Sequence, residues 1–160
     1  MSVIKTNAVR LLEQKNIPYT LYPYETEDGQ NDGLSVAEKT GVEPERVFKT
    51  LVAQGASRQY YVFLVPVLEE LHLKKAAQAC GEKKIDMIPM KELLPLTGYV
   101  KGGCSPVGMK KKFRTFIDQS GDNFEEILVS GGKVGLQIGL HPKDLVIITE
   151  ARWADICHGG

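Results

Sequence analysis

Residues 47–66 read Val-Phe-Lys-Thr-Leu-Val-Ala-Gln-Gly-Ala-Ser-Arg-Gln-Tyr-Tyr-Val-Phe-Leu-Val-Pro. Two apolar runs, rich in β-branched and aromatic residues, flank a polar turn that contains glycine. This pattern predicts two β-strands, at residues 47–53 and 60–66, around a turn at 54–57. The chain is therefore expected to contain a β-hairpin here.

Lys49 interrupts the first of these apolar runs. A lysine inside such a strand either points to solvent or enters a pocket, because burying an unpaired charge is unfavourable. Strand alternation alone favours the solvent-facing orientation.

Outward from this hairpin, the chain predicts short helices and strands that do not alternate regularly. We expect helices at residues 5–15, 35–41, 74–80, 90–94 and 141–148, and further strands at 19–24, 85–88, 113–118, 126–130 and 136–138. Thr6 is an expected helix cap, and Ser35 with Glu38 fits a capping box that starts the second helix. Strands outnumber helices, which favours a mixed α+β sheet or a partly closed barrel over a doubly wound fold.

The composition is that of an ordinary globular protein. The 160 residues are 42% hydrophobic and 25% charged, which fits one domain spanning residues 1–160. Twenty basic residues balance twenty acidic ones, so the net charge is zero. Charge-driven binding of long nucleic acid is therefore disfavoured, and any RNA contact must be local, such as a contact with the end of a tRNA.

The three cysteines, Cys80, Cys104 and Cys157, form no CxxC motif and have no metal-ligand spacing with the histidines. They are expected to be reduced thiols, and the sequence predicts neither a metal site nor a cofactor. The first residues lack the apolar core of a signal peptide, and no stretch approaches the length of a membrane span. We therefore expect a cytoplasmic protein without membrane contact.

Two glycine-rich segments are candidate ligand loops. Residues 98–108 have the glycine spacing of a phosphate-binding P-loop at Gly103 and Gly108, but Met109 replaces the required lysine. An ATP site is therefore excluded, while a structural loop and a ligand-contacting loop both stay open. Residues 130–135 fail the dinucleotide-binding pattern and favour a hairpin turn.

Cys104 lies inside the first glycine-rich segment and is a conceivable nucleophile, but no histidine is close to it in sequence. A basic run follows the same segment, made of Lys110, Lys111 and Lys112. Such a run usually forms a solvated face, although it would also suit RNA phosphates beside a site.

At these residues the sequence closely resembles the YbaK family of freestanding aminoacyl-tRNA deacylases, which is related to the editing insertion of bacterial prolyl-tRNA synthetases. The resemblance covers nearly the whole chain in the correct order. Its matching pieces are Lys5-Thr6-Asn7-Ala8-Val9, Leu11-Leu12-Glu13, Val47-Phe48-Lys49-Thr50-Leu51, Thr97-Gly98-Tyr99, Gly102-Gly103-x-Ser105-Pro106-x-Gly108-x-Lys110-Lys111, Ser130-Gly131-Gly132-Lys133-x-Gly135-Leu136 and Trp153-Ala154-Asp155-Ile156.

The resemblance implies a single α+β domain with a mixed, barrel-like central sheet flanked by helices. It implies cleavage of the ester that joins cysteine to tRNA(Pro), without a cofactor and without a covalent enzyme intermediate, through attack by the substrate's own thiol. Lys49 matches the key active-site residue of the family, in the role of stabilising charge at the ester or of anchoring the terminal nucleotide. The implied substrate contacts are Tyr24, Thr50, Gly102, Gly103, Ser105, Pro106, Ser130, Gly131, Gly132 and Gln137.

Two residues depart from the family pattern. Cys104 stands where relatives carry an aliphatic residue, which indicates a packing role, and Gln137 stands where some relatives have aspartate. The expected partners are the acceptor end of an aminoacylated tRNA and, in a transient complex, prolyl-tRNA synthetase. The alternatives are a deacylase for alanyl- or seryl-tRNA and a non-catalytic module that binds tRNA or a synthetase.

Overall fold

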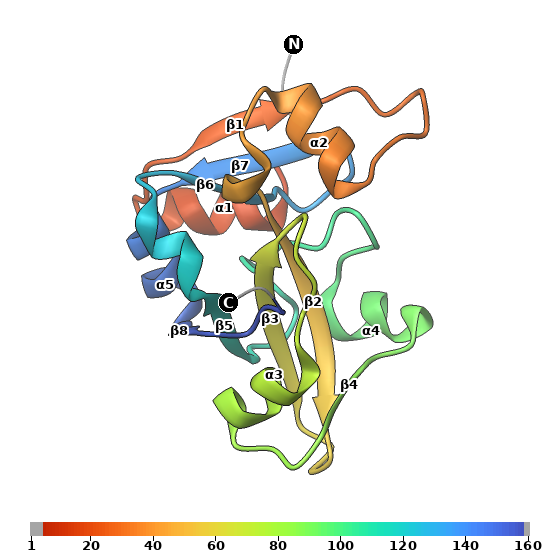
Figure 1. Ribbon diagram of the computed structural model, residues 1–160. Coiled ribbons are helices and arrows are strands. Elements are labelled where there is room, and N and C mark those ends of the chain that lie inside the picture. The colour runs from red at the N-terminus through yellow and green to blue at the C-terminus, as the bar shows by residue number, and fades with distance from the viewer. Residues whose placement is uncertain (1–4, 159–160) are drawn as a thin grey trace.

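The computed structural model describes residues 5–158, and its strands form two sheets (Figure 1). The larger sheet has the strand order β4-β2-β3-β5-β8 and the smaller one has the order β1-β7-β6. The strands are β1 (Thr20–Pro23), β2 (Phe48–Gly55), β3 (Tyr60–Pro66), β4 (Ile85–Met87), β5 (Arg114–Asp118), β6 (Ile127–Ser130), β7 (Leu136–Leu140) and β8 (Arg152–Ala154). The helices are α1 (Asn7–Gln14), α2 (Gly33–Thr40), α3 (Leu73–Cys80), α4 (Leu93–Thr97) and α5 (Pro142–Thr149), with 3-10 turns at Pro44–Arg46, Met90–Glu92 and Gln119–Asn123.

The predicted hairpin is the centre of the larger sheet. β2 and β3 pair antiparallel from Phe48 opposite Pro66 to Gln54 opposite Tyr60, which confirms the expected strands. β3 then pairs in parallel with β5, and β5 in parallel with β8, so the sheet is mixed. One face of this sheet packs against α3 through a cluster of buried side chains that includes Phe63.

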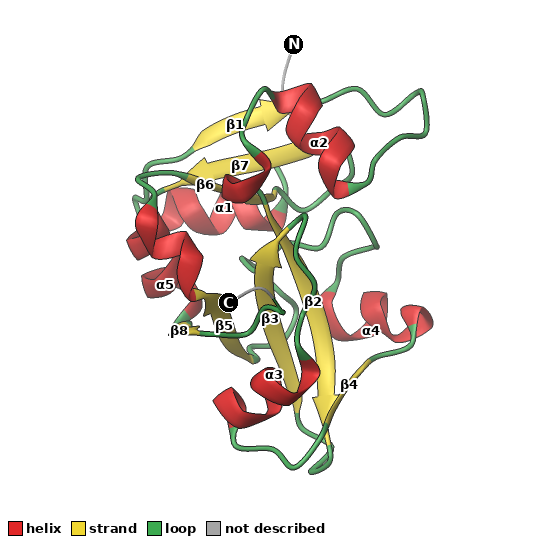
Figure 2. Ribbon diagram, in the orientation of Figure 1, coloured by secondary structure: helices red, strands yellow, loops and turns green. Residues whose placement is uncertain are grey.

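The smaller sheet is antiparallel throughout and contains β1 at its edge, where Pro23, which lacks an N–H donor, is tolerated. Figure 2 shows its strands running in a clearly different direction from β2 and β3. A second hydrophobic cluster joins this sheet to α1, α5 and the larger sheet, with Leu12, Phe48 and Ile138 among its buried members. An isolated bridge between Val47 and Leu128 links the two sheets at the start of β2.

The α+β class and the helices that flank mixed sheets are confirmed. Within residues 5–158 the strands do not close into one barrel, because they divide into two sheets that are linked by the Val47–Leu128 bridge and by side-chain packing. The short strand β8 was not predicted, and the expected helix at 90–94 is a 3-10 turn followed by α4. No helix within residues 5–158 is long and apolar enough to cross a membrane.

Helix ends follow the expected capping chemistry, with one correction. The Thr6 hydroxyl accepts from the Val9 N–H at 3.2 Å, as predicted. The second helix, however, begins at Gly33 and is capped by Asp32, not by Ser35. The Asp32 carboxylate accepts from both the N–H and the hydroxyl of Ser35, so Ser35 is the third residue of the helix.

Candidate active site

A cavity of about 260 Å³ lies where the start of β2, the start of α2, the loop after α4 and the β6–β7 hairpin meet. Figure 1 shows the loop after α4 rising beside β2 toward the smaller sheet. The cavity is lined by Tyr24, Asn31, Asp32, Gly33, Val36, Val47, Phe48, Lys49, Thr50, Leu51, Val67, Lys101, Gly102, Cys104, Ser130 and Gln137. Segments that are distant in sequence therefore converge on one site.

Six of the residues that the family resemblance implied lie together in this lining. They are Tyr24, Lys49, Thr50, Gly102, Ser130 and Gln137. Tyr24 is held at the end of β1 by its N–H, which donates to the Gly135 carbonyl at 2.9 Å. Gln137 is directly opposite Ser130 in the β6–β7 pairing, so both side chains come from one hairpin.

Lys49 lines the cavity, so the solvent-facing orientation that strand alternation favoured is wrong. Its neighbour Phe48 belongs to the hydrophobic cluster between the sheets, and the alternation of a strand turns Lys49 to the opposite face. Asn31, Asp32 and Val36, from α2 and the loop before it, line the same cavity as Lys49. The Lys49 ammonium is half-buried and lies 3.5 Å from the Val67 carbonyl oxygen.

Three oxygen atoms of the lining are buried without a hydrogen-bond partner: Asn31 Oδ1, Thr50 Oγ1 and Gln137 Oε1. Within residues 5–158 only one other side-chain atom, Ser120 Oγ, is in this state, and it lies outside the cavity. Buried polar atoms in folded proteins are nearly always paired, and leaving one unpaired is destabilising. Three such atoms in residues around one cavity make it a candidate site for a polar ligand.

Asn31, Asp32 and Lys101 were not predicted as site residues. Asn31 and Asp32 belong to the polar segment before α2, which gave no signal beyond that of a loop. Lys101 directly precedes Gly102 in the first glycine-rich segment, and that position is the one sequence signal that pointed to it. Its side chain is exposed, in contrast to that of Lys49.

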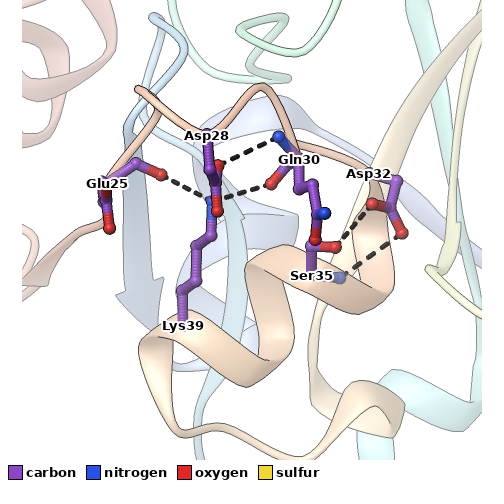
Figure 3. A network of polar contacts seen from close by, with 6 residues as sticks. All are labelled: Glu25, Asp28, Gln30, Asp32, Ser35 and Lys39. Carbon is purple, nitrogen blue, oxygen red and sulfur yellow. Dashed lines mark hydrogen bonds and ion pairs between the residues drawn. The ribbon is translucent and has the colours of Figure 1, made fainter.

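The loop that carries Asn31 is fixed by a lysine on α2 (Figure 3). The Lys39 ammonium donates to the Glu25 carbonyl, to Asp28 Oδ1 and to the Gln30 carbonyl, each at 2.8 Å. The Lys39 side chain is only 19% exposed, and its ion pair lowers the pKa of the Asp28 carboxyl. These contacts fold residues 25–32 back onto α2 and thereby define one wall of the cavity.

The first glycine-rich loop contributes to the cavity mainly through Gly102 and Cys104. A side chain at Gly103 would come within 2.8 Å of the Lys133 backbone, so this glycine permits contact between the two glycine-rich loops. The Ser105 hydroxyl is fully buried and accepts from the Val107 N–H, and Pro106 lines a different cavity. The structure therefore does not place Gly103, Ser105 or Pro106 in the lining.

The second glycine-rich segment is the turn of the β6–β7 hairpin, as predicted. The Gly131 carbonyl accepts from the Thr6 hydroxyl at 2.5 Å, and Gly132 has φ +101° beside Thr6 and Tyr99. Neither glycine lines the cavity. They shape the turn that presents Ser130, whose hydroxyl accepts from the Gly132 N–H at 3.4 Å.

Cys104 has a poor environment for a nucleophile. Its side chain is 6% exposed, and burial raises the pKa of its thiol to about 11. A catalytic cysteine needs a lowered pKa or an adjacent base. His72 and His141 instead accept hydrogen bonds at the N-termini of α3 and α5, and neither lines the cavity.

The basic run lies outside this cavity. Lys112 forms an ion pair with Glu150, and no carboxylate among the described residues pairs with Lys110 or Lys111. A larger cavity of about 590 Å³ lies between α1 and α5 beside Lys112. Apart from Lys112 it contains no residue that was predicted as a site residue, so its size does not make it the active site.

Comparison with known proteins agrees with this geometry. The family model described as an aminoacyl-tRNA editing domain matches residues 33–148, which include most of the cavity lining. The chain is 43% identical, over 95% of its own length and 93% of the relative's, to EbsC of Enterococcus faecalis (strain ATCC 700802 / V583), named as a candidate Cys-tRNA(Pro)/Cys-tRNA(Cys) deacylase.

Solved structures share the fold. One is described as a candidate trans-editing enzyme for prolyl-tRNA synthetase, with a TM-score of 0.84, 25% identity and coverage of 98% of this chain and 100% of that one. Another, the hypothetical protein APE2540, has a TM-score of 0.86 at 20% identity, covering 95% of this chain and 99% of the other. The second likeness supports the fold alone.

Proposed function

Because the chain belongs to the aminoacyl-tRNA editing domain family, we propose that it removes cysteine from wrongly charged tRNA, with cysteinyl-tRNA(Pro) as its main substrate. The observation that carries this proposal is the cavity that combines Lys49 with three unpaired buried oxygen atoms. At about 260 Å³ it suits a small amino acid esterified to a terminal ribose. The name of the Enterococcus relative supports the choice of cysteine.

The need for such an activity follows from the limits of selective binding. Cysteine and proline are similar in size, and discrimination between near-isosteres in an apolar pocket is worth only about 1–3 kcal/mol. A synthetase that cannot reject cysteine by binding alone needs a second site that clears the product. A small protein that recognises the charged acceptor end fills that role.

We propose that the substrate thiol is the nucleophile. Its sulfur attacks the ester carbonyl carbon, a C–S bond forms, and the C–O bond to the terminal ribose breaks. The thiol proton passes to solvent and the ribose oxygen gains a proton, so the products are a cyclic thiolactone and uncharged tRNA. The protein contributes orientation and electrostatic stabilisation, and the raised pKa of Cys104 gives it no competing thiolate.

The two lysines of the cavity suit two different tasks. Lys49 is half-buried and its ammonium lies 3.5 Å from the Val67 carbonyl oxygen, which suits a charge placed near the reacting ester. Lys101 is exposed at the rim, which suits a phosphate of the terminal nucleotide. The Gly103 N–H is already donated to the Val100 carbonyl at 3.0 Å, so the amides of Gly102 and Cys104 are the better candidates to face the ester oxygen.

We also propose that residues 1–160 act as one editing unit that docks transiently on prolyl-tRNA synthetase. Zero net charge gives the protein little general affinity for tRNA, and a synthetase would deliver the substrate. The cytoplasmic location stays a prediction, which cell fractionation would test.

A panel of mischarged tRNAs tests the proposed function. Purified protein is incubated with cysteinyl-tRNA(Pro), cysteinyl-tRNA(Cys), alanyl-tRNA(Pro) and seryl-tRNA, with and without prolyl-tRNA synthetase. We expect the cysteinyl ester of tRNA(Pro) to be cleared fastest, and the synthetase to accelerate its clearance. Faster clearance of an alanyl or seryl ester would assign a different amino-acid preference, and binding without clearance of any ester would identify a non-catalytic module.

A further inference from the structure

We propose that Asn31 Oδ1, Thr50 Oγ1 and Gln137 Oε1 form a subsite for the free α-amino group of the esterified amino acid. The subsite makes the protein selective for aminoacyl-tRNA and excludes tRNAs whose amino group is acylated, such as peptidyl-tRNA. This inference rests on the proposed function and names the chemical group that the unpaired oxygen atoms recognise.

The three oxygen atoms come from three separate elements. Asn31 lies on the loop that Lys39 fixes, Thr50 lies on β2 one residue after Lys49, and Gln137 lies on β7 opposite Ser130. Gln137 is only 6% exposed, so its oxygen has little access to water. A ligand that reaches all three atoms must therefore enter the cavity.

The chemistry of these atoms selects a donor-rich ligand group. Carbonyl oxygens of Asn and Gln side chains only accept hydrogen bonds, and a Thr hydroxyl can accept as well as donate. An α-ammonium group supplies three N–H donors, which equals the number of unpaired acceptors. A ribose hydroxyl supplies one donor, which would leave two of these buried oxygens unpaired.

The charge of the lining is mixed, because Lys49 and Lys101 belong to it as well as one carboxylate. Asp32 is the carboxylate of the lining and directly follows Asn31 in the chain. Its hydrogen bonds from Ser35 lower the pKa of its carboxyl, so it is ionised at neutral pH. Lys49 repels a bound ammonium, so the hydrogen bonds to the three acceptors and the Asp32 carboxylate have to offset this repulsion.

An acylated amine fits this subsite poorly for two reasons. Acylation removes the positive charge and leaves one N–H donor, so two acceptors stay unpaired in a buried position. It also adds an acyl group to a ligand that already occupies a cavity of about 260 Å³. The protein would therefore leave peptidyl-tRNA on the ribosome intact while it clears the free aminoacyl ester.

The test separates binding from cleavage. Amide-linked 3′-cysteinylamino-adenosine, which resists deacylation, and its N-acetyl form are titrated into the protein. In parallel, cleavage of cysteinyl-tRNA(Pro) and of N-acetyl-cysteinyl-tRNA(Pro) is measured. We expect the free-amine ligand to bind at least about 100-fold more tightly, because a site built to hydrogen-bond a group strongly rejects the analogue that lacks it.

Two near-isosteric variants assign this selectivity to the named atoms. Gln137→Met and Thr50→Val should each weaken binding of the free-amine ligand by about 10-fold or more, because each removes a buried hydrogen bond to a charged group. Binding of the N-acetyl ligand should not change, so the selectivity should shrink in both variants. Ser120→Ala removes the unpaired oxygen outside the cavity and should change neither value.

The outcomes distinguish the subsite from the proposed function. Preferential binding of the free amine that disappears in either folded variant supports the subsite even if no ester is cleaved, and in that case only the proposed function fails. Equal binding of the two ligands, or selectivity unchanged in both variants, overturns the subsite even if cysteinyl-tRNA(Pro) is cleared. Binding of neither ligand also overturns it.

Discussion

Lys49 and Lys101 line one cavity but differ in exposure, and substitution should separate their roles. Lys49→Ala should lower kcat by about 10²–10³, the usual effect of removing a preorganised contact to a reacting oxygen. Lys101→Ala should raise KM by up to about fivefold with little change in kcat, because an exposed ion pair contributes weakly. Steady-state kinetics on cysteinyl-tRNA(Pro) measure both values. A well-folded Lys49→Ala protein with the parent kcat would show that the site is assigned to the wrong residue.

Cys104 should be dispensable for chemistry despite its place in the lining. Cys104→Ala is expected to keep most of the deacylase activity, because the protonated thiol acts as apolar packing. The pH profile supplies a second criterion. The rate should rise toward the pKa of about 8.5 of a free substrate thiol. A rate that instead climbs to about pH 11, the region in which the Cys104 thiol ionises, would indicate attack by the enzyme.

At the scale of elements, Lys39 is expected to act as a positioning residue. Lys39→Met removes three hydrogen bonds from the loop at residues 25–32 and should loosen the wall that carries Asn31. Amide hydrogen exchange in this loop should become faster, and KM should rise more than kcat falls.

Lys5→Met is the matched control for this change, because it breaks an exposed ion pair with Glu13 and neither of these residues lines the cavity. It should leave exchange in the loop and both kinetic constants unchanged. Parent-like exchange in Lys39→Met would show that the loop does not depend on the lysine.

The elements that sequence predicted well are those specified by local patterns. The β2–β3 hairpin follows from neighbouring residues alone. So does the C-terminal end of α3, which ends at Cys80 and is capped by Gly81. β8 could not be predicted, because its three residues are strand only through pairing with β5, more than thirty positions earlier.

The site also combines residues that could be predicted from the sequence with residues whose position depends on distant parts of the chain. The residues implied by family resemblance include six of the lining, but the role of Asn31 depends on Lys39 holding its loop from a later helix. Strand alternation alone predicted the wrong orientation for the Lys49 side chain. Tertiary packing determines which part of β2 faces a cavity and which part faces open solvent. Non-local contacts such as these cannot be derived from a single strand or loop.

For the molecule as a whole, Lys110 and Lys111 of the basic run should bind tRNA phosphates outside the cavity. Changing Lys110 and Lys111 to Met should lower the slope of log affinity against log salt by about 0.7–0.9 for each phosphate that the variant no longer neutralises. Lys112→Met should leave the slope unchanged, because this lysine is paired with Glu150. Filter binding at several salt concentrations measures the slope. An unchanged slope in the double variant would show that these two lysines do not contact tRNA phosphates.

The central claim is that a cysteine ester is cleaved by its own sulfur in the Lys49 cavity. Single-turnover cleavage of cysteinyl-, S-methylcysteinyl- and seryl-tRNA(Pro) by the parent protein tests it most directly. A thiol with an ordinary pKa of about 8.5 is partly ionised and strongly nucleophilic at neutral pH, whereas a serine hydroxyl is not ionised. We expect rapid cleavage of the cysteinyl ester with thiolactone as the first product, and almost no cleavage of the other two. Rapid cleavage of the S-methyl or seryl ester would contradict the claim and indicate attack by water.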